Sequence, residues 1–379
     1  MKMAIFSDTY LPQINGVTET IINTERELRD QGLEVRLFVP RSGEVSSTNT
    51  VFTYPGIKFI LYPELEVAVP TKWSMDRKLD DFRPDIIQLM TPFSMGFSGL
   101  RYGIRHGIPT LGAYLTDFPA LAAQYGVRIM EKPLARYMRW FYSRCDLTLF
   151  PSRDIMNRTR ARGITNGTLW QAGVDLNQFS PDNYRDDVRK RYLDGDEALI
   201  LYVGRLASEK EIDVLFAAAD ILQQRGTKHR LLVVGDGPYR PYLEQMAGKS
   251  VVFAGYQTGK ELQAIYAAAD IFAFPSPNET FGMVVLEAMA SGLPVIGVDT
   301  GGVSELITNG LNGLTFTHGD SEQLARQLEL LIENPRLRHF LGQHAYNYAQ
   351  RYSWQNSCNE LLESCQQVMS DRKVDAEAN

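Results

Sequence analysis

The sequence predicts an α/β protein built from two doubly wound domains that face each other across a cleft. Short apolar runs alternate with helical patterns along the whole chain, a rhythm that is typical of parallel sheets. The runs form two successive sets, separated by a polar stretch rich in Asp, Asn and Arg. The length of 379 residues also exceeds the size at which a single hydrophobic core stops growing.

The first domain is expected to span residues 1–171. Its strands are predicted from five short apolar runs: Met3–Ser7, Val35–Val39, Ile86–Met90, Thr110–Ala113 and Leu147–Phe150. A linker is expected at residues 172–195. A helical pattern that starts at Ser353 and ends near residue 370 is expected to return to this domain, and the terminal stretch Asp371–Asn379 is expected to fray.

The second domain is expected to span residues 196–352. Five further apolar runs predict its strands: Leu199–Gly204, Leu231–Gly235, Val251–Ala254, Ile271–Phe274 and Val295–Val298. The order of strands and helices again favours a parallel sheet, because each strand is followed by a helical pattern long enough to cross back over the sheet.

Two glutamates eight residues apart flank a strand-to-helix turn in the second domain. Glu279 follows the strand Ile271–Phe274, and Glu287 lies one turn inside a helix predicted for Met283–Ser291, which Gly292 stops. Open α/β sheets bind ligands at the carboxyl ends of their strands, and first-turn helix amides lack intrahelical acceptors. The pattern therefore favours a nucleotide-sugar site. The alternative is that Glu279 caps the helix and Glu287 is solvated.

The charge of the chain is unevenly distributed. Residues 1–170 carry 21 Lys and Arg against 17 Asp and Glu, a net charge of +4, whereas the remainder carries −10. Within residues 127–144, aromatic and aliphatic side chains alternate with basic ones, among them Arg128, Lys132, Arg136, Arg139, Trp140 and Arg144. Such a helix suits an anionic membrane surface, or it is an ordinary helix with solvated arginines. Nucleic acid is a poorer fit and is not expected as a partner, because the whole chain is acidic and contains no recognised binding module.

Localisation is predicted from what the sequence does not contain. The apolar run at Met3–Phe6 is too short for a secretory leader, and no stretch approaches the length of a membrane span. Three cysteines without zinc spacing argue against a disulfide framework. A cytoplasmic protein is expected, at most peripheral at the inner face of the membrane.

Several short motifs together carry a resemblance that covers nearly the whole chain. They are Asp8 to Val17, Pro84-Asp85, Tyr114 to Pro119, Pro151-Ser152, Gly173-Val174-Asp175, Gly204-Arg205-Leu206 with Lys210, Gly235 to Pro238, and the pair Glu279 and Glu287. Their order and spacing resemble the retaining glycosyltransferases of family 4, which adopt the GT-B fold of two Rossmann-like domains. Bacterial mannosyl- and glucosyltransferases of glycolipids belong to this family.

The resemblance implies roles for the second domain. Glu279 is expected to contact the hydroxyls of the donor sugar, Glu287 the ribose, and a set of backbone amides the sugar or the phosphates: Phe281, Gly282, Met283 and Val284. Arg205 and Lys210 are expected to stabilise the leaving diphosphate in place of a metal, so no metal or other cofactor is expected. The Asp194-Gly195-Asp196 sequence falls in the expected linker and is interpreted as a turn.

Roles in the first domain follow from the same resemblance. Gly16 and Val17, just before a helix predicted for Thr18–Arg29, are expected to approach the donor through their backbone. The acceptor side is expected to include Tyr10, Asn15, Tyr114, Leu115, Thr116 and Asp117. Asp117 is expected to orient the acceptor; its alternative role is to cap a local turn.

The chain departs from the family at one position of the Tyr114 to Pro119 motif. The family usually has His where this chain has Leu115, and relatives often have a second His at the position of Gln88. Neither residue here can titrate. The leading hypothesis is a retaining hexosyltransferase that uses a UDP- or GDP-hexose and a lipid, glycolipid or other glycan acceptor. A second is a non-catalytic homologue that binds sugar nucleotides or stabilises a partner. A nucleotide-sugar epimerase is a poorer fit, because it would need more ionisable groups than this histidine-poor chain offers.

Overall fold

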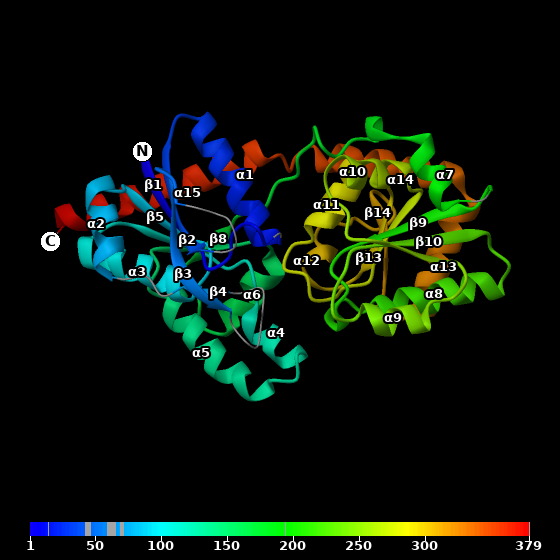
Figure 1. Cartoon of the computed structure of the whole chain (residues 1–379), viewed down its shortest axis with the longest axis horizontal. Helices are drawn as coiled ribbons and strands as arrows, with labels where there is room; N and C mark the ends of the chain where they lie inside the picture. The colour runs from blue at the N-terminus through cyan, green and yellow to red at the C-terminus, as the bar shows by residue number, and fades with distance from the viewer. Residues whose placement is uncertain (14, 42–46, 59–65, 69–71, 194, 379) are drawn as a thin grey trace. The chain divides into compact units, whose positions relative to one another are not determined.

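The computed structural model describes residues 1–13, 15–41, 47–58, 66–68, 72–193 and 195–378 (Figure 1). It forms two compact units. Unit 1 comprises Met1–Ala172 and Trp354–Asn379, and unit 2 comprises Gly173–Ser353. The stretch expected as a linker belongs to unit 2, where α7 (Asp186–Tyr192) packs against α10 (Gly259–Ala268).

Unit 1 is built on an eight-stranded sheet with the order β4-β3-β2-β1-β5-β6-β7-β8. All neighbouring strands run parallel except β3 and β4, which are antiparallel. The strands are β1 (Lys2–Phe6), β2 (Glu34–Arg41), β3 (Val51–Lys58), β4 (Glu66–Ala68), β5 (Ile86–Leu89), β6 (Thr110–Ala113), β7 (Leu147–Phe150) and β8 (Gly167–Leu169). Without the edge strands β4 and β8, the order is β3-β2-β1-β5-β6-β7. If these six strands are renumbered along the chain, this is the order 3-2-1-4-5-6 of a doubly wound Rossmann fold.

Both faces of this sheet are apolar, as a parallel sheet covered on two sides requires. Met3 and Ile5 of β1 pack under α1 and α15, whereas Ala4 and Phe6 pack in a second core under the remaining helices. The helices of unit 1 are α1 (Gly16–Asp30), α2 (Lys72–Phe82), α3 (Ser94–His106), α4 (Phe118–Gln124), α5 (Glu131–Tyr142), α6 (Arg153–Ala161) and α15 (Trp354–Ala378), with the 3₁₀ turn η1 (Arg128–Met130).

The returning C-terminal helix is longer than the sequence suggests. The helix α15 lies beside α1 on one face of unit 1 and continues to Ala378, so the prediction of a frayed tail from Asp371 is wrong for the residues described (Figure 1). Its last turns are held by Arg372, whose Nε and Nη2 donate to the two oxygens of Asp146 at 2.7 and 2.9 Å. A bidentate pair of this kind has a fixed geometry, and it fastens the helix end to the sheet.

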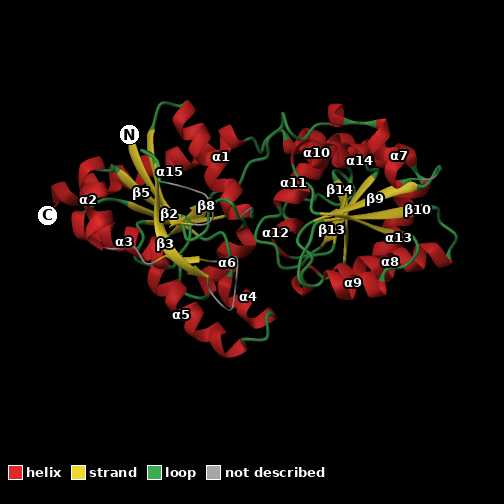
Figure 2. Cartoon of the chain, viewed as in Figure 1, coloured by secondary structure: helices red, strands yellow, loops and turns green. Residues whose placement is uncertain are grey.

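Unit 2 contains a six-stranded parallel sheet in the order β11-β10-β9-β12-β13-β14. Its strands are β9 (Ala198–Val203), β10 (His229–Val234), β11 (Val251–Gly255), β12 (Ile271–Phe274), β13 (Val295–Val298) and β14 (Gly313–Phe316). Besides α7 and α10, its helical segments are η2 (Pro181–Asn183), η3 (Ser208–Lys210), α8 (Ile212–Gln224), α9 (Arg240–Met246), α11 (Met283–Ala290), α12 (Gly301–Ser304), α13 (Ser321–Glu333) and α14 (Pro335–Ala349). Figure 2 shows α8, α9 and α13 on one side of this sheet and α7, α10 and α14 on the other.

The predicted fold class of two doubly wound α/β domains is therefore confirmed. The ten predicted strands are all present within one or two residues of their expected bounds, and four more, β3, β4, β8 and β14, were not predicted. β3 contains Pro55 and Gly56, which weaken a strand pattern, and β8 is only three residues long. Among the residues that the structure describes, no helix is both long and apolar enough to cross a membrane.

Candidate functional site

The strand order of unit 2 places a topological switch point between β9 and β12. The connections from these two neighbouring strands leave in opposite directions along the sheet, β9 toward β10 and β12 toward β13. At such a switch point the loops after the two strands separate and leave room for a ligand. The loop after β9 carries Arg205 and Lys210, and the loop after β12 carries Glu279.

Lys210 and Glu279, 69 residues apart in the sequence, meet at this switch point. Lys210 Nζ donates to Glu279 Oε1. Their side chains are 19% and 21% exposed, so the pair is partly shielded from water and still open to a ligand. Glu279 also raises the pKa of the buried Tyr202 below it, after burial itself, which is the larger cause. A fixed, half-buried cation of this kind can stabilise an anionic ligand more strongly than one in bulk water.

Glycines shape the loops on both sides of the pair. A Cβ on Gly235 would lie 1.9 Å from Gly204 O, and one on Gly237 would lie 2.3 Å from Leu206 O, so neither position admits a side chain. On the other side, a Cβ on Gly302 would lie 2.4 Å from Thr280 O. The loops after β9 and β12 are therefore packed directly on neighbouring backbone, which holds Arg205 and Glu279 in place.

The helix α11 begins at the far end of the Glu279 loop. Gly282 is its N-cap with φ of 99°, a left-handed conformation that favours glycine. The expected donor amides of Phe281, Gly282, Met283 and Val284 lie at this helix start, where backbone N–H groups have no intrahelical acceptor. Glu287 lies one turn further, and its Oε2 accepts from the hydroxyl of buried Tyr266 at 2.8 Å. No sequence pattern indicates that Tyr266 is the residue that orients Glu287.

Unit 1 has an equivalent switch point between β1 and β5, and its polar groups are used differently. Asp8, fully buried after β1, accepts from Thr91 Oγ1 at 2.6 Å, from Ser94 Oγ at 2.7 Å and from Met95 N at 2.8 Å. Burial raises the pKa of Asp8, and these hydrogen bonds partly offset that effect. Asp8 thus caps α3, whose own N-cap residue, Phe93, makes no side-chain cap.

The residues expected on the acceptor side serve local structure. Asn15 Oδ1 accepts from Thr18 N at 3.0 Å and caps α1, so the helix starts at Gly16, with Val17 in its first turn, rather than at Thr18. Tyr10 is 8% exposed in the core under α1, where burial raises its pKa to about 12. The contacts of Tyr10 and Asn15 with other described residues do not identify an acceptor, so their assignment to the acceptor side stays a prediction.

Asp117 shows the capping alternative directly. Its Oδ1 accepts from Arg162 Nη1 at 2.7 Å, from Tyr114 OH at 3.2 Å and from Ala120 N at 3.4 Å, and it is the N-cap of α4. Tyr114 is 1% exposed, with its ring among core aromatics. Leu115 and Thr116, between them, are half-buried. The structure thus gives Tyr114 and Asp117 a structural role that accounts for their contacts.

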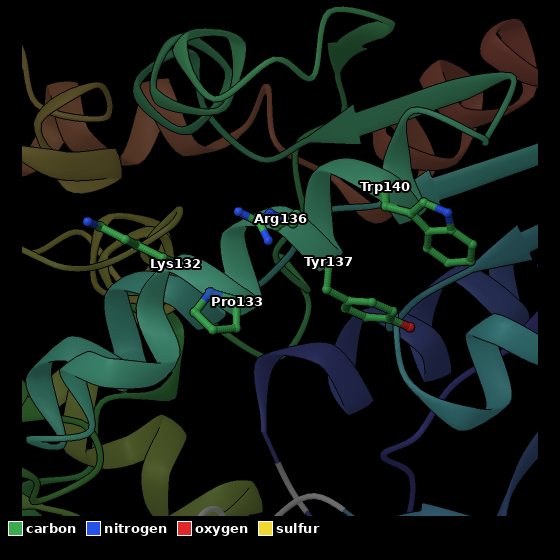
Figure 3. A pocket seen from close by; sticks show the side chains of 5 residues that line it. All are labelled: Lys132, Pro133, Arg136, Tyr137 and Trp140. Atoms are coloured by element: carbon green, nitrogen blue, oxygen red, sulfur yellow. The ribbon is translucent and has the colours of Figure 1, made fainter.

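The basic helix of unit 1, α5, is amphipathic. Met138, Phe141 and Tyr142 of α5 are buried, whereas every residue expected at the membrane is exposed: Arg128, Lys132, Arg136, Arg139, Trp140 and Arg144. On the exposed side an open hollow is lined by Lys132, Pro133, Arg136, Tyr137 and Trp140 (Figure 3).

Further apolar side chains extend this surface. The ring of Phe97, from α3, stacks on Trp140 at a centroid distance of 6.0 Å, and the guanidinium of Arg144 lies 4.5 Å from the Trp140 ring centroid. Ile129 is 84% exposed. Large apolar and basic side chains are thus presented together. We define the α5 patch as the set of Phe97, Arg128, Ile129, Lys132, Arg136, Arg139, Trp140 and Arg144.

In the described part of the chain, no group of three or more His, Cys, Asp or Glu side chains is placed to hold a metal ion. Of the Asp194-Gly195-Asp196 sequence, Asp194 lies outside the described residues. Asp196 pairs with Lys228 Nζ at 3.0 and 3.1 Å on the surface of unit 2.

Comparison with known proteins identifies the family. The family model of glycosyltransferase family 4 matches residues 14–178, and that of glycosyl transferases group 1 matches residues 184–348. A GDP-mannose-dependent alpha-mannosyltransferase of Mycobacterium tuberculosis is 34% identical over 383 residues, 99% of each chain. An alpha-monoglucosyldiacylglycerol synthase of Streptococcus pneumoniae is 28% identical over 91% of this chain and 82% of its own.

The fold agrees with this assignment. A sucrose-phosphate synthase from Thermosynechococcus elongatus superposes with a TM-score of 0.79, at 19% identity, over 98% of this chain and 99% of its own. Two doubly wound units, a charged pair at the switch point of the second, and sequence relatives that match from end to end lead to one conclusion. The chain belongs to the family 4 glycosyltransferases and is an enzyme of the GT-B fold.

Proposed function

We propose that this protein is a retaining hexosyltransferase that moves a sugar from a UDP- or GDP-activated donor to a lipid, glycolipid or other glycan acceptor. The observation that carries the proposal is the Lys210–Glu279 pair at the switch point of unit 2. The names of the relatives support the two halves of the reaction. One uses GDP-mannose, and another makes a glucosyldiacylglycerol.

The charged pair suits a donor that carries both a diphosphate and a sugar. Lys210 and Arg205 would face the diphosphate, whose negative charge grows as the glycosidic bond breaks, and Glu279 would accept from sugar hydroxyls. Before the donor binds, Glu279 pairs with the Lys210 ammonium, and the arriving diphosphate would replace this carboxylate as the partner of the cation. The amides from Phe281 to Val284 and the carboxylate of Glu287 would complete the site on the α11 side.

Retention of the anomeric configuration is proposed to proceed by attack from the face of the leaving group. The acceptor oxygen bonds to the anomeric carbon as the bond to the diphosphate breaks, and the departing phosphate takes the acceptor proton. This route needs no protein nucleophile, and it needs no metal if Arg205 and Lys210 supply the positive charge. It also remains open to a chain with Leu115 where the family usually has His.

The test is a transfer assay with GDP-mannose, UDP-glucose and UDP-galactose against diacylglycerol and a total lipid extract. We expect one donor to give product, with the α-linkage of the donor retained in the NMR spectrum of the product. A β-linked product would contradict retention. Donor hydrolysis without acceptor is measured alongside, because an intact donor site reacts slowly with water. Absence of both hydrolysis and transfer with every donor would favour the non-catalytic homologue.

The α5 patch supports a second part of the proposal, in which a cytoplasmic enzyme meets its lipid acceptor at an anionic membrane surface. Exposed arginines would contact phosphate headgroups, each contributing about 1 kcal/mol, while Trp140 and Ile129 would enter the interface. Vesicle binding should weaken as salt rises, because salt screens the attraction between the arginines and the headgroups. It should not vanish, because salt does not screen the insertion of Trp140 and Ile129.

Vesicle sedimentation tests this part. The triple change of Arg136, Arg139 and Arg144 to Ser is expected to weaken binding to phosphatidylcholine vesicles containing phosphatidylglycerol by about tenfold or more. The control changes Arg26, Arg77 and Arg160, exposed residues elsewhere on unit 1, to Ser, which alters the net charge equally. Equal binding by both triple variants would show that α5 is an ordinary surface helix.

A further inference from the structure

The residue that follows Lys210 has an unusual backbone conformation. Glu211 has φ of 50° and ψ of 41°, the left-handed region. Among the described residues, Arg83 is the other non-glycine residue with positive φ. A side chain with a Cβ is sterically disfavoured there, and glycine is the usual solution. An L-residue keeps this conformation when contacts around it hold it in place.

The conformation of Glu211 sets the direction of Lys210. Lys210 ends the 3₁₀ turn η3, α8 begins at Ile212, and Glu211 alone joins the two segments. The turn is closed by Lys210 N, which donates to Ala207 O at 3.0 Å, and by Glu211 N, which donates to Ser208 O at 3.2 Å. A change of φ at Glu211 would rotate η3 against α8 and move the Lys210 ammonium away from Glu279.

His318 holds the side chain of Glu211. Its Nε2 lies 2.7 Å from Glu211 Oε2 and 2.9 Å from Oε1. A carboxylate has no proton to give, so Nε2–H is the donor.

The loop that carries His318 is itself braced. Asp320 Oδ1 accepts from Gln323 N at 2.8 Å and caps α13, and Thr317 N donates to Gln323 Oε1 at 2.7 Å. These reciprocal bonds fix both neighbours of the His318–Gly319 step. His318 therefore presents its imidazole to Glu211 from a loop that is tied to a helix.

We propose that His318 and Glu211 form a clamp that keeps the left-handed turn in place and so positions Lys210 for the donor's diphosphate. The inference rests on the proposed donor site, and both members are positioning residues. The clamp predicts that His318 is needed to position Lys210 only when residue 211 has a side chain. With glycine at 211 the turn needs no clamp.

A double-mutant cycle in the full-length protein tests this. The variants are His318→Ala, Glu211→Gly and the two combined, with His339→Ala, an exposed histidine elsewhere in unit 2, as the control. We expect His318→Ala to weaken binding of GDP or UDP about tenfold in calorimetry and to lower the melting temperature. Glu211→Gly is expected to bind within a factor of two of wild type, and His318→Ala added to it is expected to change neither quantity.

The clamp would be overturned if His318→Ala lowered nucleotide affinity and melting temperature equally whether residue 211 is Glu or Gly. It would also be overturned if His318→Ala lowered neither quantity in either background. Glu211→Asn provides a further check if the glycine variant folds poorly, because Asn tolerates the left-handed region. Coupling that shows in the melting temperature and is absent from nucleotide affinity would overturn the positioning of Lys210. A wild-type protein that binds neither GDP nor UDP would instead contradict the proposed donor site, and the melting temperatures would still decide on the clamp.

Discussion

The two units place charged groups at the same point of the same topology, and they use them in opposite ways. At the switch point of unit 1, Asp8 is fully buried and accepts hydrogen bonds from three donors in the segment that follows β5. At the switch point of unit 2, Glu279 and Lys210 contact each other and remain about one fifth exposed. A buried carboxylate that accepts three hydrogen bonds within the fold serves stability. A pair that a ligand can reach and rearrange serves binding.

Removing either member of the exposed pair should have the largest effect. Lys210→Ala and Glu279→Ala are each expected to lower the transfer rate by about 10² to 10³-fold, since each removes a preorganised charge contact. The melting temperature should change little. The matched control is Lys228→Ala, which breaks the exposed pair with Asp196 in the same unit. Rates within threefold of wild type for both site variants would show that the donor binds elsewhere.

Asp8→Ala is expected to have the converse effect. It leaves two hydroxyls and the Met95 amide without their acceptor in a buried region, which should cost about 3 kcal/mol of folding free energy in urea unfolding. Calorimetric binding of nucleoside diphosphate should be nearly unchanged. Asp81→Ala, at an exposed position of the same unit, controls for the loss of a carboxylate. A stable Asp8→Ala protein that no longer binds the donor would show that Asp8 serves binding rather than stability, and so would contradict the difference between the two switch points.

A smaller change is expected at Leu115, the position where the family usually has His. Leu115→His should be at least as active as wild type with a common hexose donor, or should exchange one donor for another, because it introduces a hydrogen-bonding group beside the acceptor-side motif. Rates with a panel of UDP- and GDP-sugars measure this. A lower rate than that of wild type with every sugar nucleotide of the panel would contradict this prediction.

No change is expected on chelation. Because Arg205 and Lys210 are proposed to supply the charge at the diphosphate, transfer in EDTA should equal transfer in magnesium. Loss of activity in EDTA that manganese or magnesium restores would contradict this assignment.

The sequence predicted the parts of this account that depend on local patterns. The strand Ile271–Phe274, the loop with Glu279 and the helix from Met283 were all evident, because a buried strand, a turn and a helix stop at Gly292 each leave a local signal. The pairing of Lys210 with Glu279 depends on β9 lying beside β12 in the sheet, an order that neither the residues nor the family resemblance predicted.

Other features could not be read from the sequence. Asp8 follows an apolar strand just as Glu279 does, and only burial distinguishes a structural carboxylate from an exposed one. Tyr114 and Asp117 lie in a motif that predicts an acceptor site, and that motif did not indicate the contacts of Asp117 Oδ1 with Arg162 and the start of α4. His318 is more than 100 residues from Glu211, and no local pattern links a loop histidine to a left-handed turn.

Lys210 is proposed to bind the diphosphate and Glu279 to contact the sugar, and calorimetric titration of GDP and UDP into three full-length proteins distinguishes these two roles. Wild type should bind one of the two nucleotides. Lys210→Ala should bind it at least tenfold more weakly, whereas Glu279→Gln should bind it as tightly as wild type or more tightly, because the carboxylate no longer competes for the Lys210 ammonium. Unchanged affinity in Lys210→Ala, or an equal loss in both variants, would contradict the account.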